Sequence, residues 1–208
     1  MENFVINLGR ELGSGGREIG RALATHYGIA FYDKELITLA AEESGLDVRF
    51  FKQNDERNKR RIMGGIFGMR FPFTVDGNVG HGTPLDGDQL FKVQSDVIRK
   101  AAEKGSGLFV GRCADYVLRD HPRAVSIFIS AHKEDRLRRI SALYGVDLRK
   151  AENLMEKADR KRSEYYNFYS LKTWGAAASY DLCINSSVLG VEETVKFLCS
   201  FIDRRFGF

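Results

Sequence analysis

The sequence feature that most constrains the fold is a glycine-rich turn near the N-terminus. An apolar run at residues 4–8 leads into Gly-Ser-Gly-Gly-Arg at residues 13–17, and a helical pattern follows. Glycine lets the backbone curl so that several N–H groups point at one anion, and a helix N-terminus favours negative charge. An ordinary strand-to-helix connection is the alternative. The dense glycines, the arginine that follows them and the preceding apolar strand favour a variant phosphate-binding loop of P-loop type.

Size and composition predict one soluble domain, with or without a mobile lid. The 208 residues are 43% hydrophobic and 12% aromatic, which is ample for a packed core. No apolar run approaches the ~20 residues that a membrane span needs. Glu2 leads directly into the first strand, unlike a signal peptide. Three cysteines without metal-site spacing indicate reduced thiols. We therefore expect a cytoplasmic protein with no membrane partner.

The net charge of +4 is mild, but its distribution is uneven. Residues 133–162 hold ten Lys or Arg against six Asp or Glu, and residues 49–70 hold seven against two. Scattered solvated faces are one explanation for these two basic stretches. A binding site for a polyanionic ligand explains them better. They lack the regular aromatic interleaving of single-strand binders, so nucleic acid is an unlikely partner.

Strand and helix patterns alternate along the chain, which predicts a parallel sheet covered on both faces. Expected strands are 4–8, 29–32, 108–110, 124–129 and 180–184. Expected helices are 17–27, 34–44, 47–62, 88–104, 133–144, 146–164 and 191–205, with a polar turn at 185–187. Residues 63–87 contain seven glycines and two prolines, and we interpret them as a substrate-side flap or an oligomer contact.

Two charged residues follow predicted strands, where ligands of parallel sheets bind. Asp33 ends the strand at 29–32, and either meets a ligand or only caps the next helix. Arg112 follows the apolar strand at 108–110, and a guanidinium there needs a carboxylate or a phosphate as its partner. A structural salt bridge and a ligand contact both remain open for it.

The order of these features resembles the cytidylate kinases, and more closely the cytidylate kinase-like family of bacterial P-loop proteins. The opening run Gly-Arg-Glu-Leu-Gly-Ser-Gly-Gly-Arg-Glu-Ile-Gly-Arg at 9–21, followed by Phe-Tyr-Asp-Lys-Glu-Leu at 31–36, is similar to that family's leading signature. Gly111-Arg112 resembles a Glu-Gly-Arg-Asp element, and Asp-Arg-Lys-Arg at 159–162 resembles an Asp-Arg-Asp-Arg lid. Residues 181–195 resemble the family's final strand, turn and helix.

The resemblance implies an α/β P-loop fold of the nucleoside monophosphate kinase type. It implies a five-stranded parallel sheet with helices on both faces and an arginine-rich helical lid. Residues 1–208 would form a single domain, with a monophosphate-binding insert at 45–90 and a lid at 145–175. The implied activity is ATP-dependent phosphorylation of a nucleoside monophosphate, CMP or dCMP, with Mg²⁺. The alternative is a nucleotide-binding or phosphate-sensing protein that keeps the fold without turnover.

The resemblance also implies roles for individual residues. Those expected to bind ATP are Gly13, Ser14, Gly15, Gly16, Arg17, Glu18, Arg136 and Ser186. Those expected to bind the acceptor are Asp33 and Arg112, and those expected to act on the transferring group are Arg17, Arg112, Arg160 and Arg162. Glu18 is the expected Mg²⁺ ligand, and residues 63–87 are the expected homo-oligomer contact.

The sequence departs from the usual P-loop at several positions. Placing Arg17 where such loops have lysine puts Glu11 at the first glycine and Glu18 at the Ser/Thr that holds Mg²⁺. Cys113 takes the place of the aspartate after Gly-Arg, and Asp115 is the nearest carboxylate. These departures motivate the alternative without turnover.

Overall fold

The fold is organised around a parallel sheet at its centre. The computed structural model describes residues 2–33 and 87–208. Its strands are β1 Val5–Arg10, β2 Ala30–Tyr32, β3 Gly107–Val110, β4 Ala124–Ser130 and β5 Leu182–Asn185. They form one five-stranded sheet in the order β2-β3-β1-β4-β5, and every pair in it is parallel. The predicted five-stranded parallel sheet is confirmed.

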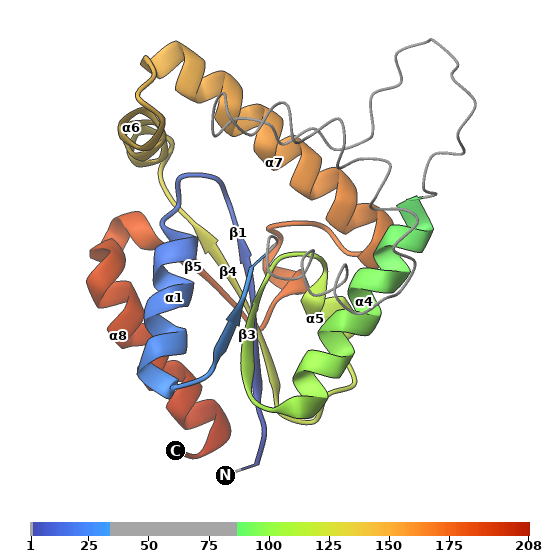
Figure 1. The fold of residues 1–208 in the computed structure, drawn as a ribbon. Helices are drawn as coiled ribbons and strands as arrows, with labels where there is room; N and C mark the ends of the chain where they lie inside the picture. The colour runs from blue at the N-terminus through green and yellow to red at the C-terminus, as the bar shows by residue number, and fades with distance from the viewer. Residues whose placement is uncertain (1, 34–86) are drawn as a thin grey trace, which may run out of the picture.

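Helices cover both faces of this sheet, as the alternating pattern predicted (Figure 1). One face carries α1 (Gly16–Tyr27) and α8 (Ser186–Phe206), and the other carries α4 (Gly87–Lys104) and the short α5 (Ala114–Val117). The remaining elements are α6 (Lys133–Tyr144), α7 (Leu148–Ser170) and the single-turn η1 (Ala177–Ser179). Among the described residues, no helix is long and apolar enough to cross a membrane.

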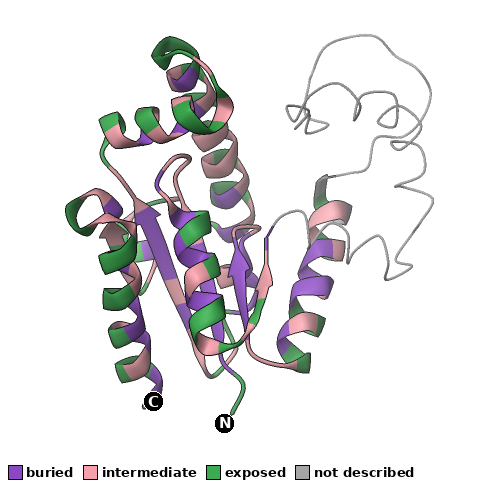
Figure 2. Cartoon of the chain, turned by 60° about the vertical axis from the view of Figure 1, so that its left-hand side comes forward, coloured by how far each residue is buried: buried purple, intermediate pink, exposed green. Residues whose placement is uncertain are grey.

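Strand β1 lies in the middle of the sheet and contributes to the core on both faces. Ile6 and Leu8 pack with α1 and α8, while Val5 packs with α4 and α5. All three side chains are almost completely buried, and burial is most continuous along the central strands β1 and β3 (Figure 2). A strand that is buried on both faces must be almost wholly apolar, which explains the uninterrupted hydrophobic run that precedes the glycines.

The carboxyl ends of the parallel strands meet at one edge of the sheet, and this edge positions the candidate site. Strand β1 ends there at Arg10, β2 is followed by Asp33, and β3 is followed by Gly111 and Arg112. Helix α7 runs across this edge, above the turn between β1 and α1 (Figure 1). Residues that are far apart in the sequence are therefore gathered beneath one helix.

Two helices are longer than the sequence pattern indicated. Helix α7 continues to Ser170 because the aromatic residues after 164 pack on the body of the protein: Tyr166 is buried, and Tyr169 stacks on Phe91 at a ring distance of 4.1 Å. Helix α8 begins at Ser186, so the predicted polar turn at 185–187 is wrong. The Asn185 side chain caps it, and a kink at Gly190 separates its first turn from the rest.

Other sequence predictions have mixed outcomes. The helices expected at 34–44 and 47–62 lie outside the described residues. So does the flap expected at 63–87, apart from Gly87, which begins α4. The three cysteines are free thiols; Cys113 and Cys199 are buried and Cys183 is exposed.

Replacement of Ile6 by alanine tests the central place of β1. Ile6 is fully buried in the middle strand, so Ile6→Ala should lower the free energy of unfolding by about 2–5 kcal/mol through lost burial and a cavity. Leu143→Ala is the control, because that side chain is 74% exposed and its loss should change stability by no more than about 0.5 kcal/mol. Equal effects in urea unfolding would contradict this packing.

Candidate phosphate-binding site

The turn between β1 and α1 has the backbone geometry of an anion-binding loop. Gly13 and Gly15 adopt left-handed conformations with φ of 80° and 76°, and α1 begins at Gly16. A Cβ on Gly13 would lie 2.7 Å from the carbonyl oxygen of Arg136, so no larger residue fits. The N–H of Gly16 donates to Ser14 Oγ at 3.3 Å. The next N–H groups of α1 have no partner within the helix, and such groups are the donors that bind phosphate at helix N-termini.

Side chains bind the carbonyl oxygens of this loop. Four successive carbonyls, those of residues 11–14, each accept a hydrogen bond of 2.7–3.2 Å. The donors are, in that order, Ser14 Oγ, Arg136 Nε, Arg139 Nη1 and Ser186 Oγ. Because the carbonyl dipoles are already bound by the surrounding protein, the loop is preorganised to offer N–H groups to an anion.

A buried charge network ties the loop to helices α6 and α7. The guanidinium of Arg136 is 9% exposed and contacts the carboxylate of Glu11 at 3.0 Å and that of Asp159. Asp159 also accepts the N–H of Leu12 at 2.9 Å and the guanidinium of Arg162 at 3.1 Å. Asp159 and Arg162 lie one turn apart on α7, which brings the pair together. This pair is one part of a network that fixes α7 over the loop.

The environment of this network shifts two pKa values. Burial raises the pKa of Glu11, an effect that the charge of Arg136 opposes. Burial lowers the pKa of Arg162, and Asp159 opposes that shift. Carboxylates and guanidinium groups therefore compensate one another here, as buried charges must.

Arg17 and Asp33 form an ion pair. Arg17 Nη2 lies 2.6 Å from Asp33 Oδ2, with the Asp33 side chain 6% exposed and that of Arg17 59% exposed. The sequence analysis placed Arg17 at the donor nucleotide and Asp33 at the acceptor. The structure brings the two together between the start of α1 and the end of β2.

Arg112 stands on a strained turn at the end of β3. Gly111, Arg112 and Cys113 are consecutive left-handed residues, with φ of 75°, 58° and 54°. Such conformations cost about 1–3 kcal/mol each for non-glycine residues and cluster at functional sites. The Arg112 guanidinium lies 5.5 Å from the ring centroid of Tyr165, whose hydroxyl donates to Gln94 at 3.2 Å. This turn aims Arg112 at the edge of the sheet below α7.

Beside Arg112, Asp115 forms a buried polar pair with Tyr166. The Tyr166 hydroxyl donates to Asp115 Oδ2 at 2.7 Å. Burial raises the pKa of Asp115, and the hydrogen bond from Tyr166 opposes the shift. Burial also raises the pKa of the Cys113 thiol to about 12, so that thiol is neutral at physiological pH. Cys113 therefore cannot supply the charge of the aspartate that it replaces.

Other predicted site residues occupy less central positions. Arg160 is exposed on α7, and Glu18 is exposed in the first turn of α1. Arg136 and Ser186 are buried beneath the loop, where they hold its carbonyls, and their predicted contacts with ATP stay predictions. Within the described part of the chain, no three His, Cys, Asp or Glu residues gather as a metal site. One carboxylate plus phosphate oxygens is nevertheless a usual Mg²⁺ environment, which Glu18 fits.

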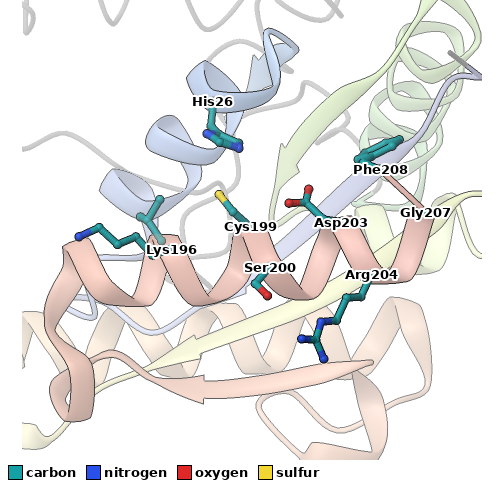
Figure 3. Close-up of a pocket in the computed structure, with 9 residues that line it drawn as sticks. His26, Lys196, Cys199, Ser200, Asp203, Arg204, Gly207 and Phe208 are labelled. Carbon is teal, nitrogen blue, oxygen red and sulfur yellow. The ribbon is translucent and has the colours of Figure 1, made fainter.

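A separate groove lies between α1 and α8, about 620 Å³ in volume (Figure 3). His26 at the end of α1 and Cys199 and Asp203 on α8 are among its lining residues. It is open to solvent near the C-terminus, at the opposite end of α1 from the glycine loop. It is therefore not part of the candidate phosphate site.

A protein-family model matches the part of the chain that contains the candidate site. Residues 5–188 match the model of the cytidylate kinase-like family, a range that contains the loop, Asp33, Arg112 and the charged network. The chain belongs to the cytidylate kinase-like family. The resemblance found in the opening signature is thus confirmed.

Individual relatives support the same assignment. A curated cytidylate kinase from Methanopyrus kandleri is 28% identical over 97% of this chain and 94% of its own length. A crystal structure of an uncharacterized protein from Eubacterium ventriosum is 31% identical, covers 96% of this chain and 98% of its own, and superposes with a TM-score of 0.72. Shikimate kinase from Bacteroides thetaiotaomicron, at 16% identity, coverage of 97% and 99%, and a TM-score of 0.52, shares the fold. The protein is therefore kinase-like in family and in architecture.

Sequence reasoning missed several residues that shape the loop. Glu11 was noticed only as a departure from the usual motif, yet it anchors Arg136 and accepts the N–H of Ala131 at 3.1 Å. Arg139 was interpreted only as part of a basic helix, and Arg10 only as one residue of the family signature at 9–21. A cation at the end of the strand before the glycines was the signal that could have identified Arg10.

Asp159→Asn tests the network. Neutralising Asp159 leaves Arg136 and Arg162 with one carboxylate fewer in a mostly buried site, so the free energy of unfolding should fall by about 3 kcal/mol. Asp96→Asn is the matched control, because its pair with Arg99 is largely exposed and should contribute no more than about 1 kcal/mol. A variant as stable as the wild type in urea would show that the network does not hold the loop.

Asp115 predicts a pH dependence of stability. Its folded-state pKa is raised above the ordinary 3.8, so the folded state holds the proton more tightly than the unfolded chain. The stability that Asp115 contributes relative to Asp115→Asn should therefore be largest below 3.8 and decline as pH rises through the raised pKa. Denaturant unfolding of both proteins between acid and neutral pH measures this difference. A difference that grows with pH would contradict the sign.

Proposed function

We propose that the protein is an ATP-dependent nucleoside monophosphate kinase, with CMP or dCMP as the acceptor. The observation that carries this proposal is the preorganised loop at the carboxyl edge of the sheet, with Asp33 and Arg112 at the ends of the neighbouring strands. Membership of the cytidylate kinase-like family and the relative named cytidylate kinase support the nucleotide as substrate.

On the donor side, the loop from Gly13 to Glu18 receives the β- and γ-phosphates of ATP. Its N–H groups and the start of α1 provide the positive potential. Arg136 and Ser186 contribute by holding the loop's carbonyl oxygens. Mg²⁺, when bound with the nucleotide, neutralises phosphate charge, and Glu18 is the carboxylate that we assign to it.

On the acceptor side, Arg112 binds the phosphate of the monophosphate and Asp33 lies near its nucleoside. The ion pair between Asp33 and Arg17 connects this side to the first turn of α1. Arg160 and Arg162 belong to the helix that covers the site, and we assign them to the charge of the transferring group. Residues 45–90 complete the acceptor side in this proposal, and residues 63–87 offer a contact between copies of the chain.

The transfer itself needs positioning more than acid–base chemistry. An oxygen of the acceptor's phosphate, already anionic near neutral pH, attacks the γ-phosphorus of ATP. The bond between the γ-phosphorus and the β–γ bridging oxygen breaks, and ADP leaves with that electron pair. The arginines balance the charge, and α7 over the loop limits access of water. Such chemistry uses the ATP of the cytoplasm, and we propose that the protein is located there.

A coupled assay of ADP release with purified protein, ATP and Mg²⁺ tests the proposal. We expect turnover with CMP or dCMP above that with AMP, UMP and GMP, and above the rate without acceptor. Absence of turnover with every nucleoside monophosphate would overturn the kinase function.

One observation favours a second function, nucleotide binding without turnover. Helix α1 starts at Gly16, which has no side chain, and the next residue, Arg17, pairs with Asp33. The start of the helix therefore lacks the lysine that contacts phosphate in the common P-loop. Tight binding of ATP in a protein that is inert in the assay would select this function over the first.

Arg112→Gln should separate acceptor binding from donor binding. Loss of a charged hydrogen-bond donor to the acceptor's phosphate should raise the KM for the monophosphate by at least about tenfold and leave the KM for ATP within about twofold. Arg119→Gln is the matched control, because Arg119 is exposed and lies 4.5 Å from the ring centroid of Tyr116. An unchanged KM for the monophosphate in Arg112→Gln would remove Arg112 from the acceptor site.

A further inference from the structure

Arg10, the last residue of β1, has its side chain extended from beside Gly16 to beside Gly111. Its backbone carbonyl accepts Arg162 Nη1 at 3.5 Å, which places the strand end within reach of helix α7. The side chain is half-buried, and two glycines from distant parts of the sequence define its path.

The stem of Arg10 fills the space above the first residue of α1. A Cβ built on Gly16 would lie 2.6 Å from Arg10 Cβ and 3.1 Å from Arg10 Cγ. No side chain larger than hydrogen fits at Gly16 while Arg10 keeps this position. The volume that a side chain at the start of the helix would use is therefore occupied by an arginine that comes from the strand.

The guanidinium of Arg10 ends on the other side of the site, at the turn after β3. A Cβ on Gly111 would lie 2.4 Å from Arg10 Nη1, and Gly111 has a φ of 75°. Arg112, the proposed ligand of the acceptor's phosphate, is the next residue. The Arg10 side chain thus spans from the donor loop toward the acceptor side.

We propose that Arg10 is the cation that binds the terminal phosphate of the donor nucleotide, in place of a side chain at Gly16. In the common P-loop a lysine near the start of the helix reaches the β- and γ-phosphates. Here the first helical residue is Gly16, which has no side chain, and Arg17, the residue first aligned with that lysine, pairs with Asp33. Arg10 supplies a permanently charged, planar group from the strand side instead. This inference rests on the proposed binding of ATP by the loop.

The geometry also explains why the two glycines are coupled to the arginine. Gly16 makes room for the stem and Gly111 makes room for the guanidinium, although they lie 95 positions apart in the chain. A half-buried guanidinium interacts with phosphate more strongly than a fully solvated one, because the local dielectric constant is lower. Arg10 therefore adds to binding when the phosphate chain is long enough to reach it.

Isothermal titration with a non-hydrolysable ATP analogue, ADP and AMP tests the assignment. Arg10→Gln should weaken binding of the ATP analogue by at least about tenfold, as expected for loss of a charged hydrogen-bond donor, and change binding of AMP by no more than about twofold. Arg99→Gln is the control, because Arg99 lies on α4 and pairs with nearby Asp96 in an exposed ion pair. Arg10→Lys keeps the stem and the charge but loses the planar fork, and should weaken the analogue about fivefold.

A double-mutant cycle tests whether Gly16→Ala weakens nucleotide binding by displacing Arg10. The added Cβ displaces the Arg10 stem, so Gly16→Ala should weaken the ATP analogue as Arg10→Gln does, and should have no further effect in the Arg10→Gln background. Gly20→Ala, in the same helix but facing Leu8, should leave affinity within about twofold.

The outcomes are separable. A wild type that does not bind the ATP analogue would overturn the proposed function and this inference together. A wild type that binds it, with Arg10→Gln or folded Arg10→Lys binding equally well, would overturn the inference alone. Additive losses in the cycle would show that Gly16→Ala acts independently of Arg10, which also contradicts it.

Discussion

The buried guanidinium of Arg136 is the interaction on which the candidate site depends most. It donates to the carbonyl of Leu12 and contacts the carboxylates of Glu11 and Asp159, so one side chain joins the loop to two helices. Buried charges are costly unless each has its partners, and here the partners come from the loop itself and from α7. The loop's shape and the position of α7 are therefore not independent of each other.

This connection changes the physical meaning of the arginine-rich segment at 159–162. A lid with mobile arginines would leave Asp159 and Arg162 exposed to solvent in the absence of ligand. In the structure Arg162 is largely buried and paired with Asp159, while Arg160 is exposed on the same helix. Besides the role proposed for it in phosphate transfer, Arg162 holds the helix on the loop through Asp159 and the carbonyl of Arg10, whereas Arg160 is exposed beside that contact. Two arginines of the same short motif thus have different physical environments.

The strand–loop–helix order, the parallel sheet and its covering helices could be predicted from the sequence, because apolar runs and helical periodicity are local signals. The pair of Asp159 and Arg162 was also predictable, since its members are one helical turn apart. The ion pair of Arg17 with Asp33 and the contacts of Arg136 were not, because they depend on how β2, α6 and α7 are placed in space. Glu11 misled the motif comparison for the same reason: its function is visible only beside Arg136.

A crystal structure with a non-hydrolysable ATP analogue tests the central claim most directly. The account predicts the β- and γ-phosphates against the N–H groups of residues 13–18, with the Arg10 guanidinium on the terminal phosphate. The network of Arg136, Glu11 and Asp159 should be unchanged. A nucleotide bound elsewhere, such as in the groove between α1 and α8, with the loop empty at saturating analogue, would contradict it.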